Sequence, residues 1–329
     1  MRLPSEIKKV RHQRFRKRAA DLEDRKPFAR FPWWLRLLSS LPLSAWYGFA
    51  TLLAFLMDHV FRARREIIDM QLKACFPQED EAWIRRTRSA FYRNFADVSV
   101  EIVKAISMTR QDIDRRIRFE DDGPARTALE SGQSVMIVTS HNCNWEWTLL
   151  KLSTGLQRPI QAAYKPLKGR WGDRLMLTIR SRFGAEMITA KRLLIRVMRY
   201  RRGPARMIAM VTDQAPTSSG VRYFAQFMGL DTAFFVGPEA IARSGKLPVF
   251  YLAMRRESRG RYCIRFVPIA RAGEELAPGQ MIERYAAEVE RVTRESPPDW
   301  LWNYRRWKVQ RDAEGHPHVV KSGLIRAPD

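Results

Sequence analysis

The sequence of 329 residues is 45% apolar and 11% aromatic, enough for one α/β domain with a full hydrophobic core, and a second full-sized domain is not expected. Lys and Arg outnumber Asp and Glu by 59 to 35, so the net charge of +24 favours anionic partners: phospholipid headgroups, phosphorylated ligands, acidic proteins or nucleic acid. The three cysteines are too widely spaced for a metal-binding pattern, and their odd number argues against a disulfide framework and favours a reducing cytoplasm.

The N-terminal residues are strongly basic. Residues 1 to about 30 carry a run of Lys and Arg that begins at Lys8, and such charge runs are typical of a mobile or surface-lying tail. No apolar stretch with a small-residue cleavage site follows this run directly. The pattern therefore differs from that of a cleavable signal peptide.

An apolar segment follows at residues 31–62, and we predict that it anchors the chain to a membrane. Its central part, Leu41 to Met57, has seventeen residues without a charge. As a helix these residues reach about 25 Å, the lower limit for crossing a bilayer core. Aromatic residues near its ends favour membrane contact over the alternative, a buried helix of a soluble core. Because basic residues flank both ends, a short span and an in-plane insertion both remain open.

The rest of the chain shows the pattern of an α/β fold. Apolar spacing predicts helices between residues 64 and 110, and after residue 133 apolar runs typical of buried strands alternate with helical patterns. Strands are expected at 134–140, 206–212 and 247–254, with a more exposed strand at 261–267. Helices are expected at about 170–183, 191–201, 236–245 and 280–295. These repeats predict a largely parallel central sheet flanked by helices, with functional residues at the carboxyl ends of strands.

No glycine-rich phosphate loop or dinucleotide fingerprint occurs in the sequence, so we expect no cofactor and no metal. The chain is expected to divide into a basic tail at 1–30, the membrane-anchoring segment at 31–62, a catalytic domain at 63–310 and a polar C-terminal tail at 311–329.

One histidine stands out by its place in the predicted fold. Four of the five lie in the predicted tails or at the end of the apolar segment: His12, His59, His316 and His318. The fifth, His141, directly follows the strand predicted at 134–140. A strand-to-helix turn there lets Glu146 hold one imidazole nitrogen while the other accepts a proton from a hydroxyl. We therefore predict His141 as a general base and Glu146 as its orienting acid, with a structural histidine as the alternative.

Cys143 allows a rival mechanism within the same turn. Activated by His141, its thiol would act as a nucleophile and carry the transferred group as a thioester. We favour the alternative, a small buried or half-buried residue that lines the turn, because a base acting on an acceptor hydroxyl needs no covalent stage.

Several ordered motifs carry a family resemblance. The first is a His, four residues and then an acid, met by His141 and Glu146. The others are Tyr164-Lys-Pro166, Arg180-Ser-Arg-Phe-Gly184, Thr212-Asp-Gln-Ala-Pro216, Phe227-Met-Gly229 with Thr232, and Trp302-Asn-Tyr-Arg-Arg-Trp-Lys308. From about residue 31 to 310 the chain resembles the lipid A late acyltransferases, the lauroyl and myristoyl transferases of the lysophospholipid acyltransferase superfamily. It departs from that family at Lys165, which is more often Arg, and at Tyr304, which is usually His.

The resemblance implies a direct acyl transfer. The 3-hydroxyl of a glucosamine-linked acyl chain would attack the thioester of an acyl carrier protein, with His141 as the base and Glu146 orienting it. An Arg after the second motif helps at the site in that family, and Arg180 matches it best. Asp213 and Gln214 end a predicted strand, where a site role competes with a simple surface turn. Lys165 would contact a phosphate, with a solvated lysine as the alternative.

The implied partners agree with the charge of the chain. Acyl carrier protein is acidic, lipid A precursors carry phosphates and the inner leaflet is anionic. We therefore expect an acyl carrier protein thioester, a phosphorylated glycolipid acceptor and the bacterial inner membrane as partners, with the catalytic domain on the cytoplasmic side. A related acyltransferase acting on another glycolipid, an ornithine lipid or an aryl polyene is an alternative. A nucleic-acid-binding module is a further alternative, but it explains neither the apolar segment nor the charged pair at a strand end, so no nucleic acid is expected.

Overall fold

A seven-stranded sheet forms the centre of the protein in the computed structural model, which describes residues 25–200, 203–216, 222–312 and 314–320. The basic tail expected at residues 1–30 therefore lies mostly outside the described residues. The strand order is β1-β9-β8-β2-β5-β3-β4, and every neighbouring pair is parallel except β8 and β9. The strands are β1 (Ile117–Glu120), β2 (Val135–Thr139), β3 (Ile160–Tyr164), β4 (Glu186–Thr189), β5 (Met207–Val211), β8 (Val249–Ser258) and β9 (Arg261–Ala270). The predicted, largely parallel sheet is thus confirmed.

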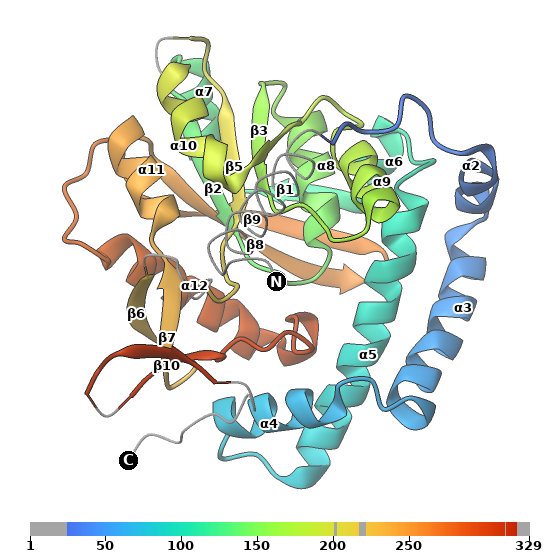
Figure 1. Ribbon diagram of the computed structural model, residues 1–329. Helices are drawn as coiled ribbons and strands as arrows, with labels where there is room; N and C mark the ends of the chain where they lie inside the picture. The colour runs from blue at the N-terminus through green and yellow to red at the C-terminus, as the bar shows by residue number, and fades with distance from the viewer. Residues whose placement is uncertain (1–24, 201–202, 217–221, 313, 321–329) are drawn as a thin grey trace, which may run out of the picture.

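Helices cover both faces of this sheet (Figure 1). After residue 64 the α-helices are α4 (Arg65–Cys75), α5 (Glu81–Lys104), α6 (Arg110–Arg116), α7 (Gly123–Glu130), α8 (Trp145–Gly155), α9 (Arg170–Arg180), α10 (Ala190–Arg199), α11 (Gly237–Gly245) and α12 (Gln280–Glu295). Of these, α4 lies away from the sheet and packs against α5. Side chains alternate across a strand, so Met136 and Val138 of β2 pack into one apolar core while Val135 and Ile137 pack into the other. This burial on both faces explains why β2 reads as a continuous apolar run.

The register of the central strands places two loops side by side. In the parallel pairing of β2 with β5, Thr139 lies opposite Val211, so both strands end at the same edge of the sheet. His141 follows β2 by two residues and Asp213 follows β5 by two residues. The fold therefore brings these two side chains together at the carboxyl edge, where functional residues gather in parallel sheets.

The strand predicted at 261–267 is longer and less exposed than expected. As β9 it extends to Ala270 and lies between β1 and β8, and Tyr262, Ile264 and Phe266 are buried. Two hairpins stand outside the main sheet. They are β6 (Arg222–Phe227) with β7 (Leu230–Phe235), and β10 (Val309–Arg311) with β11 (Pro317–Val319).

The N-terminal apolar segment is broken into two helices. They are α2 (Trp33–Ser40) and α3 (Leu43–Phe55), and a π-helical turn η1 (Leu56–Val60) extends the second. The break falls at Leu41, because the proline that follows disfavours helical backbone in the residue before it. Among the described residues no single helix is long and apolar enough to cross a bilayer, and the two helices satisfy these criteria only as a pair bent by 95°.

Helix α3 presents one face to the protein and the other outward. Ala50 and Ala54 are buried where α3 packs along α5 at the edge of the molecule (Figure 1). Phe49, Leu52 and Phe55 point away from the core and are 53%, 55% and 54% exposed. Large apolar side chains exposed on one face of a helix are typical of a contact surface.

Candidate active site

The two strand ends form a His–Asp pair. His141 Nδ1 lies 2.6 Å from Asp213 Oδ1, and the backbone N–H of His141 donates to Asp213 Oδ2 over 2.9 Å. The Trp300 indole N–H donates to the same oxygen over 2.9 Å. The carboxylate is 3% exposed, so these three donors fix it and the imidazole in one orientation.

The electrostatics of Asp213 favour an ionised acceptor. Burial raises the pKa of its carboxyl, but the charge of His141 and the hydrogen bonds from His141 and Trp300 outweigh burial and leave the pKa below its ordinary value. A carboxylate at Nδ1 selects the tautomer that carries its proton there. The other nitrogen, Nε2, is then free to accept a proton.

Gln214 lies against that second nitrogen. Its Nε2 is 3.2 Å from His141 Nε2, so the side-chain amide donates to the unprotonated imidazole nitrogen. The His141 side chain is 16% exposed, and Trp145 lies beside it with ring centroids 5.1 Å apart. The Gln214 amide therefore occupies the unprotonated nitrogen of the imidazole, the position from which a base would accept a proton.

Glu146 has a different partner from the one we predicted. In the first turn of α8, its two carboxylate oxygens accept from Arg180 Nε over 2.8 Å and from Arg180 Nη2 over 2.6 Å. Burial raises the pKa of Glu146, but the charge and hydrogen bonds of Arg180 outweigh it and lower the pKa overall. The structure thus places Asp213 at the His141 imidazole and Glu146 at Arg180. The charge of His141 also lowers the pKa of Glu146, which agrees with a place close to the same site.

The turn between β2 and α8 is tightly held. Cys143 has a left-handed backbone with φ of 49°, and its N–H donates to the Asp299 carbonyl over 2.9 Å. Its thiol is buried and lies 3.4 Å from the Met254 carbonyl. Burial raises the pKa of this thiol well above its ordinary value, which disfavours the thiolate. These observations favour our interpretation of Cys143 as a small buried residue over the nucleophile.

Lys165 lies apart from this cluster. It follows β3, which neighbours β5, so it stands at the same carboxyl edge of the sheet with an exposed side chain. No hydrogen bond or ion pair joins it to His141 or Asp213, all three being described residues. Of the six predicted site residues, the structure therefore groups His141, Asp213 and Gln214, and sets Glu146 with Arg180 beside them.

Trp300 and Asn144 belong to the site and were missed from the sequence. Trp300 holds Asp213 from 87 residues away, and Asn144 caps α8 by accepting the Trp147 N–H over 3.0 Å. An Asn before an apolar helix is a recognisable cap signal, so Asn144 could have been found. The contact of Trp300 depends on the tertiary fold.

Comparison with known protein families matches residues 31–309 to the family described as bacterial lipid A biosynthesis acyltransferase. This range covers most of the 329 residues and contains all of the site residues above. The chain belongs to that family. A search of curated proteins found no match to the chain. Family membership confirms the resemblance seen in the motifs and identifies the protein as an acyltransferase, for which a base facing an acceptor hydroxyl is the fitting chemistry.

Proposed function

We propose that the protein transfers a fatty acyl chain from the thioester of an acyl carrier protein to a hydroxyl of a phosphorylated lipid A precursor, with His141 as the general base. The observation that carries this proposal is the His141–Asp213 pair, whose 2.6 Å contact at Nδ1 leaves Nε2 for the substrate. Membership in the acyltransferase family supplies the reaction class.

In the proposed reaction the acceptor hydroxyl takes the place of the Gln214 amide at His141 Nε2. The base removes the hydroxyl proton as the oxygen attacks the thioester carbonyl carbon, so a C–O bond forms and the C–S bond breaks. The imidazolium returns its proton to the departing carrier thiolate. Asp213 stabilises the transient imidazolium, because the lowered pKa of its carboxyl keeps it ionised.

Glu146 and Arg180 support this site in a second way. The Arg180 side chain is 21% exposed although Glu146 binds it with two hydrogen bonds. A guanidinium held in this way presents a fixed positive charge to a phosphate or to the developing oxyanion. Glu146 thus acts by fixing Arg180 beside the reacting groups, and Lys165 offers a further cation at the same edge.

The surroundings support the proposed donor and location. A net charge of +24 favours encounter with an acidic carrier and with anionic lipid. The outward face of α3 offers Phe49, Leu52 and Phe55 to a bilayer surface. All three cysteines are free and buried, as suits a reducing compartment. We therefore propose the cytoplasmic face of the bacterial inner membrane as the site of action.

The test is the initial rate of acyl transfer from an acyl carrier protein thioester to a purified lipid A precursor. His141→Ala should lower the rate by about 100- to 10,000-fold, the usual worth of a general base. Cys143→Ala should stay within about tenfold, because a direct transfer has no acyl-enzyme. The abundance of each variant in membranes serves as the control.

Four outcomes would contradict the proposal in different parts. An active His141→Ala would remove the site assignment. Acyl label trapped on Cys143, together with an inactive Cys143→Ala, would replace direct transfer by a covalent route. Equal rates with acyl-coenzyme A and with the acyl carrier protein thioester at all salt concentrations would contradict the proposed donor. Transfer only to an unrelated lipid would contradict the proposed acceptor.

A further inference from the structure

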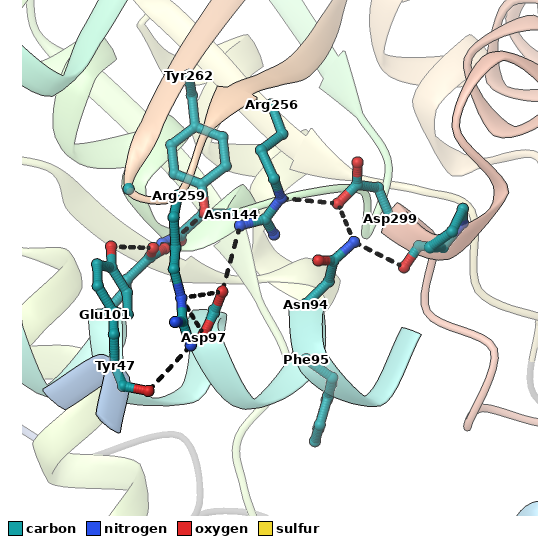
Figure 2. Close-up of polar contacts among 12 residues, drawn as sticks. Tyr47, Asn94, Phe95, Asp97, Glu101, Asn144, Arg256, Arg259, Tyr262 and Asp299 are labelled. Atoms are coloured by element: carbon teal, nitrogen blue, oxygen red, sulfur yellow. Dashed lines mark hydrogen bonds and ion pairs between the residues drawn. The ribbon is translucent and has the colours of Figure 1, made fainter. Parts of the chain in front are cut away.

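Glu101 is a buried carboxylate that the proposed reaction does not use. It lies on α5, is fully buried, and accepts hydrogen bonds from three different elements (Figure 2). Tyr47 of α3 donates to Oε1 over 2.8 Å. Asn144, which precedes α8, and Tyr262, which lies on β9, each donate to Oε2 over 2.7 Å. Losing any one of these three contacts would destabilise the fold, because it would leave a buried polar group without a hydrogen bond.

The contact with Asn144 connects Glu101 to the catalytic turn. The Asn144 side chain has two roles: its oxygen accepts the Trp147 N–H over 3.0 Å and caps α8, while its nitrogen donates to Glu101. The Trp147 indole N–H also donates to the Glu101 carbonyl over 3.0 Å. Glu101 therefore fixes the orientation of the amide that joins the His141 turn to its helix.

The same turn is held from a neighbouring direction by Asp299. Its carbonyl accepts the Cys143 N–H, and its carboxylate accepts from Arg256 Nε over 3.1 Å. Arg256 lies beside the Glu101 cluster, as Figure 2 shows, and its charge opposes the rise that burial causes in the pKa of Glu101. Asp213 holds His141 on one side of the turn, and this polar cluster holds Cys143 and Asn144 on the other.

We propose that Glu101 is a positioning residue for acyl transfer: it fixes the turn at residues 141–144 through Asn144 and joins that turn to α3 through Tyr47. The rate effect of this inference rests on the proposed function, whereas its effect on the turn does not. A shift of about 1 Å in a base commonly costs on the order of 100-fold in rate, so a fixed turn has a measurable value.

The test reverses the polarity of the Glu101–Asn144 contact. Glu101→Leu removes both acceptor oxygens from the Asn144 amide, and Asn144→Asp keeps the helix cap but sets two carboxyl groups face to face. In the double variant Glu101→Gln with Asn144→Asp, the Gln amide donates to the new carboxylate, so a hydrogen bond is restored in the opposite direction. Ser99→Ala is the matched control, because Ser99 lies on the same helix and its hydroxyl donates only within that helix, to the Phe95 carbonyl.

Two measurements follow on the full-length protein in membranes or detergent. Each single variant should lower kcat by about 10- to 100-fold with little change in KM, and should speed amide hydrogen exchange in a peptide that covers residues 141–148. The double variant should recover most of both properties, and Ser99→Ala should change neither. A role limited to general stability would lower the melting temperature of the single variants while the kcat of the folded protein stayed unchanged.

The outcomes separate this inference from the proposed function. Unchanged exchange and unchanged kcat in Glu101→Leu, or no recovery in the double variant, would overturn the positioning role. Absence of acyl transfer by the wild type would remove the proposed function, while the exchange data would still decide the role of Glu101. If Glu101→Leu does not accumulate, Asn144→Asp and the double variant still decide the positioning role. Tyr47→Phe removes only the α3 donor, and normal exchange over 141–148 in that variant would overturn the link to α3.

Discussion

At the scale of single residues, the site gives two buried carboxylates partners that the sequence analysis did not predict. Asp213 and Glu146 are both buried, and both keep a pKa below the ordinary value against the effect of burial. Asp213 does so mainly through the charge of His141, and Glu146 mainly through the charge of Arg180. In the proposed reaction, the first carboxylate therefore assists proton transfer by His141, and the second fixes the Arg180 guanidinium.

Asp213→Asn tests that division. The change keeps the shape but removes the charge that selects the imidazole tautomer, so kcat should fall by roughly 1,000- to 10,000-fold with a small change in KM. Because Asp213 acts only through His141, the double variant His141→Ala with Asp213→Asn should lose no more than His141→Ala alone. Steady-state kinetics of the three variants measure this. Losses that add up in the double variant would mean that Asp213 acts independently of the histidine.

The sequence predicted several residues of the candidate site but not their pairing, and it missed Trp300 and Asn144. His141 and Asp213 were both predicted from their places after buried strands, and the structure joins them across 72 residues. The spacing of His141 and Glu146 suggested a direct contact, because a sequence alone shows only which residues are close along the chain. Which carboxylate reaches the imidazole depends on the register of β2 with β5, and that register is set by the whole sheet.

At the scale of elements, long and strongly patterned segments were predicted well and short ones were missed. The runs at β2, β5 and β8 are continuous and apolar because the helices bury both faces. β4 has only four residues and begins with an exposed Glu186, so its pattern is too short to read. The strand β9 was expected to be more exposed because its alternate residues Arg261 and Arg265 are charged, yet β1 covers its outer edge.

The ion pair between α8 and α9 gives an element-scale prediction with a pH dependence. Arg180→Met leaves Glu146 buried without its counter-charge, which should cost about 3–5 kcal/mol of unfolding free energy near neutral pH. In the wild type Arg180 keeps the pKa of Glu146 low, so this stabilisation is present above the ordinary carboxyl pKa and is lost only as the pH falls through the lowered value. Without Arg180, burial raises the pKa, and protonation relieves the buried charge as the pH falls.

The melting temperature of the variant in detergent should therefore lie far below that of the wild type at about pH 8, and the gap should narrow toward about pH 5. The double variant Arg180→Met with Glu146→Gln is the control, since it has no buried charge at this position and its gap should not depend on pH. If the difference in melting temperature between Arg180→Met and the wild type did not change with pH, the buried charge of Glu146 would not be the cause of the destabilisation.

At the scale of the whole molecule, the sequence located the apolar segment but could not give its geometry. Length and composition left a span and an in-plane insertion open. The break at Leu41 and the 95° bend between α2 and α3 are consequences of local backbone chemistry and of packing against α5. They make α3 a helix with one face on the protein and one face outward, which suits insertion along a membrane surface.

The outward face of α3 should carry the membrane binding. Replacing Phe49 and Leu52 by Glu removes two large side chains from lipid, about 3 kcal/mol of apolar burial and roughly a 100-fold loss in partition coefficient. Leu194 and Ile195 are also exposed apolar residues, but they lie on α10, on the opposite side of the view in Figure 1, so the same substitutions there are the matched control.

Sedimentation with anionic vesicles measures the bound fraction. High salt alone should not release the wild type, because apolar burial is insensitive to charge screening. Wild-type protein that stays in the supernatant, or equal release by the α3 and α10 variants, would contradict an α3 anchor.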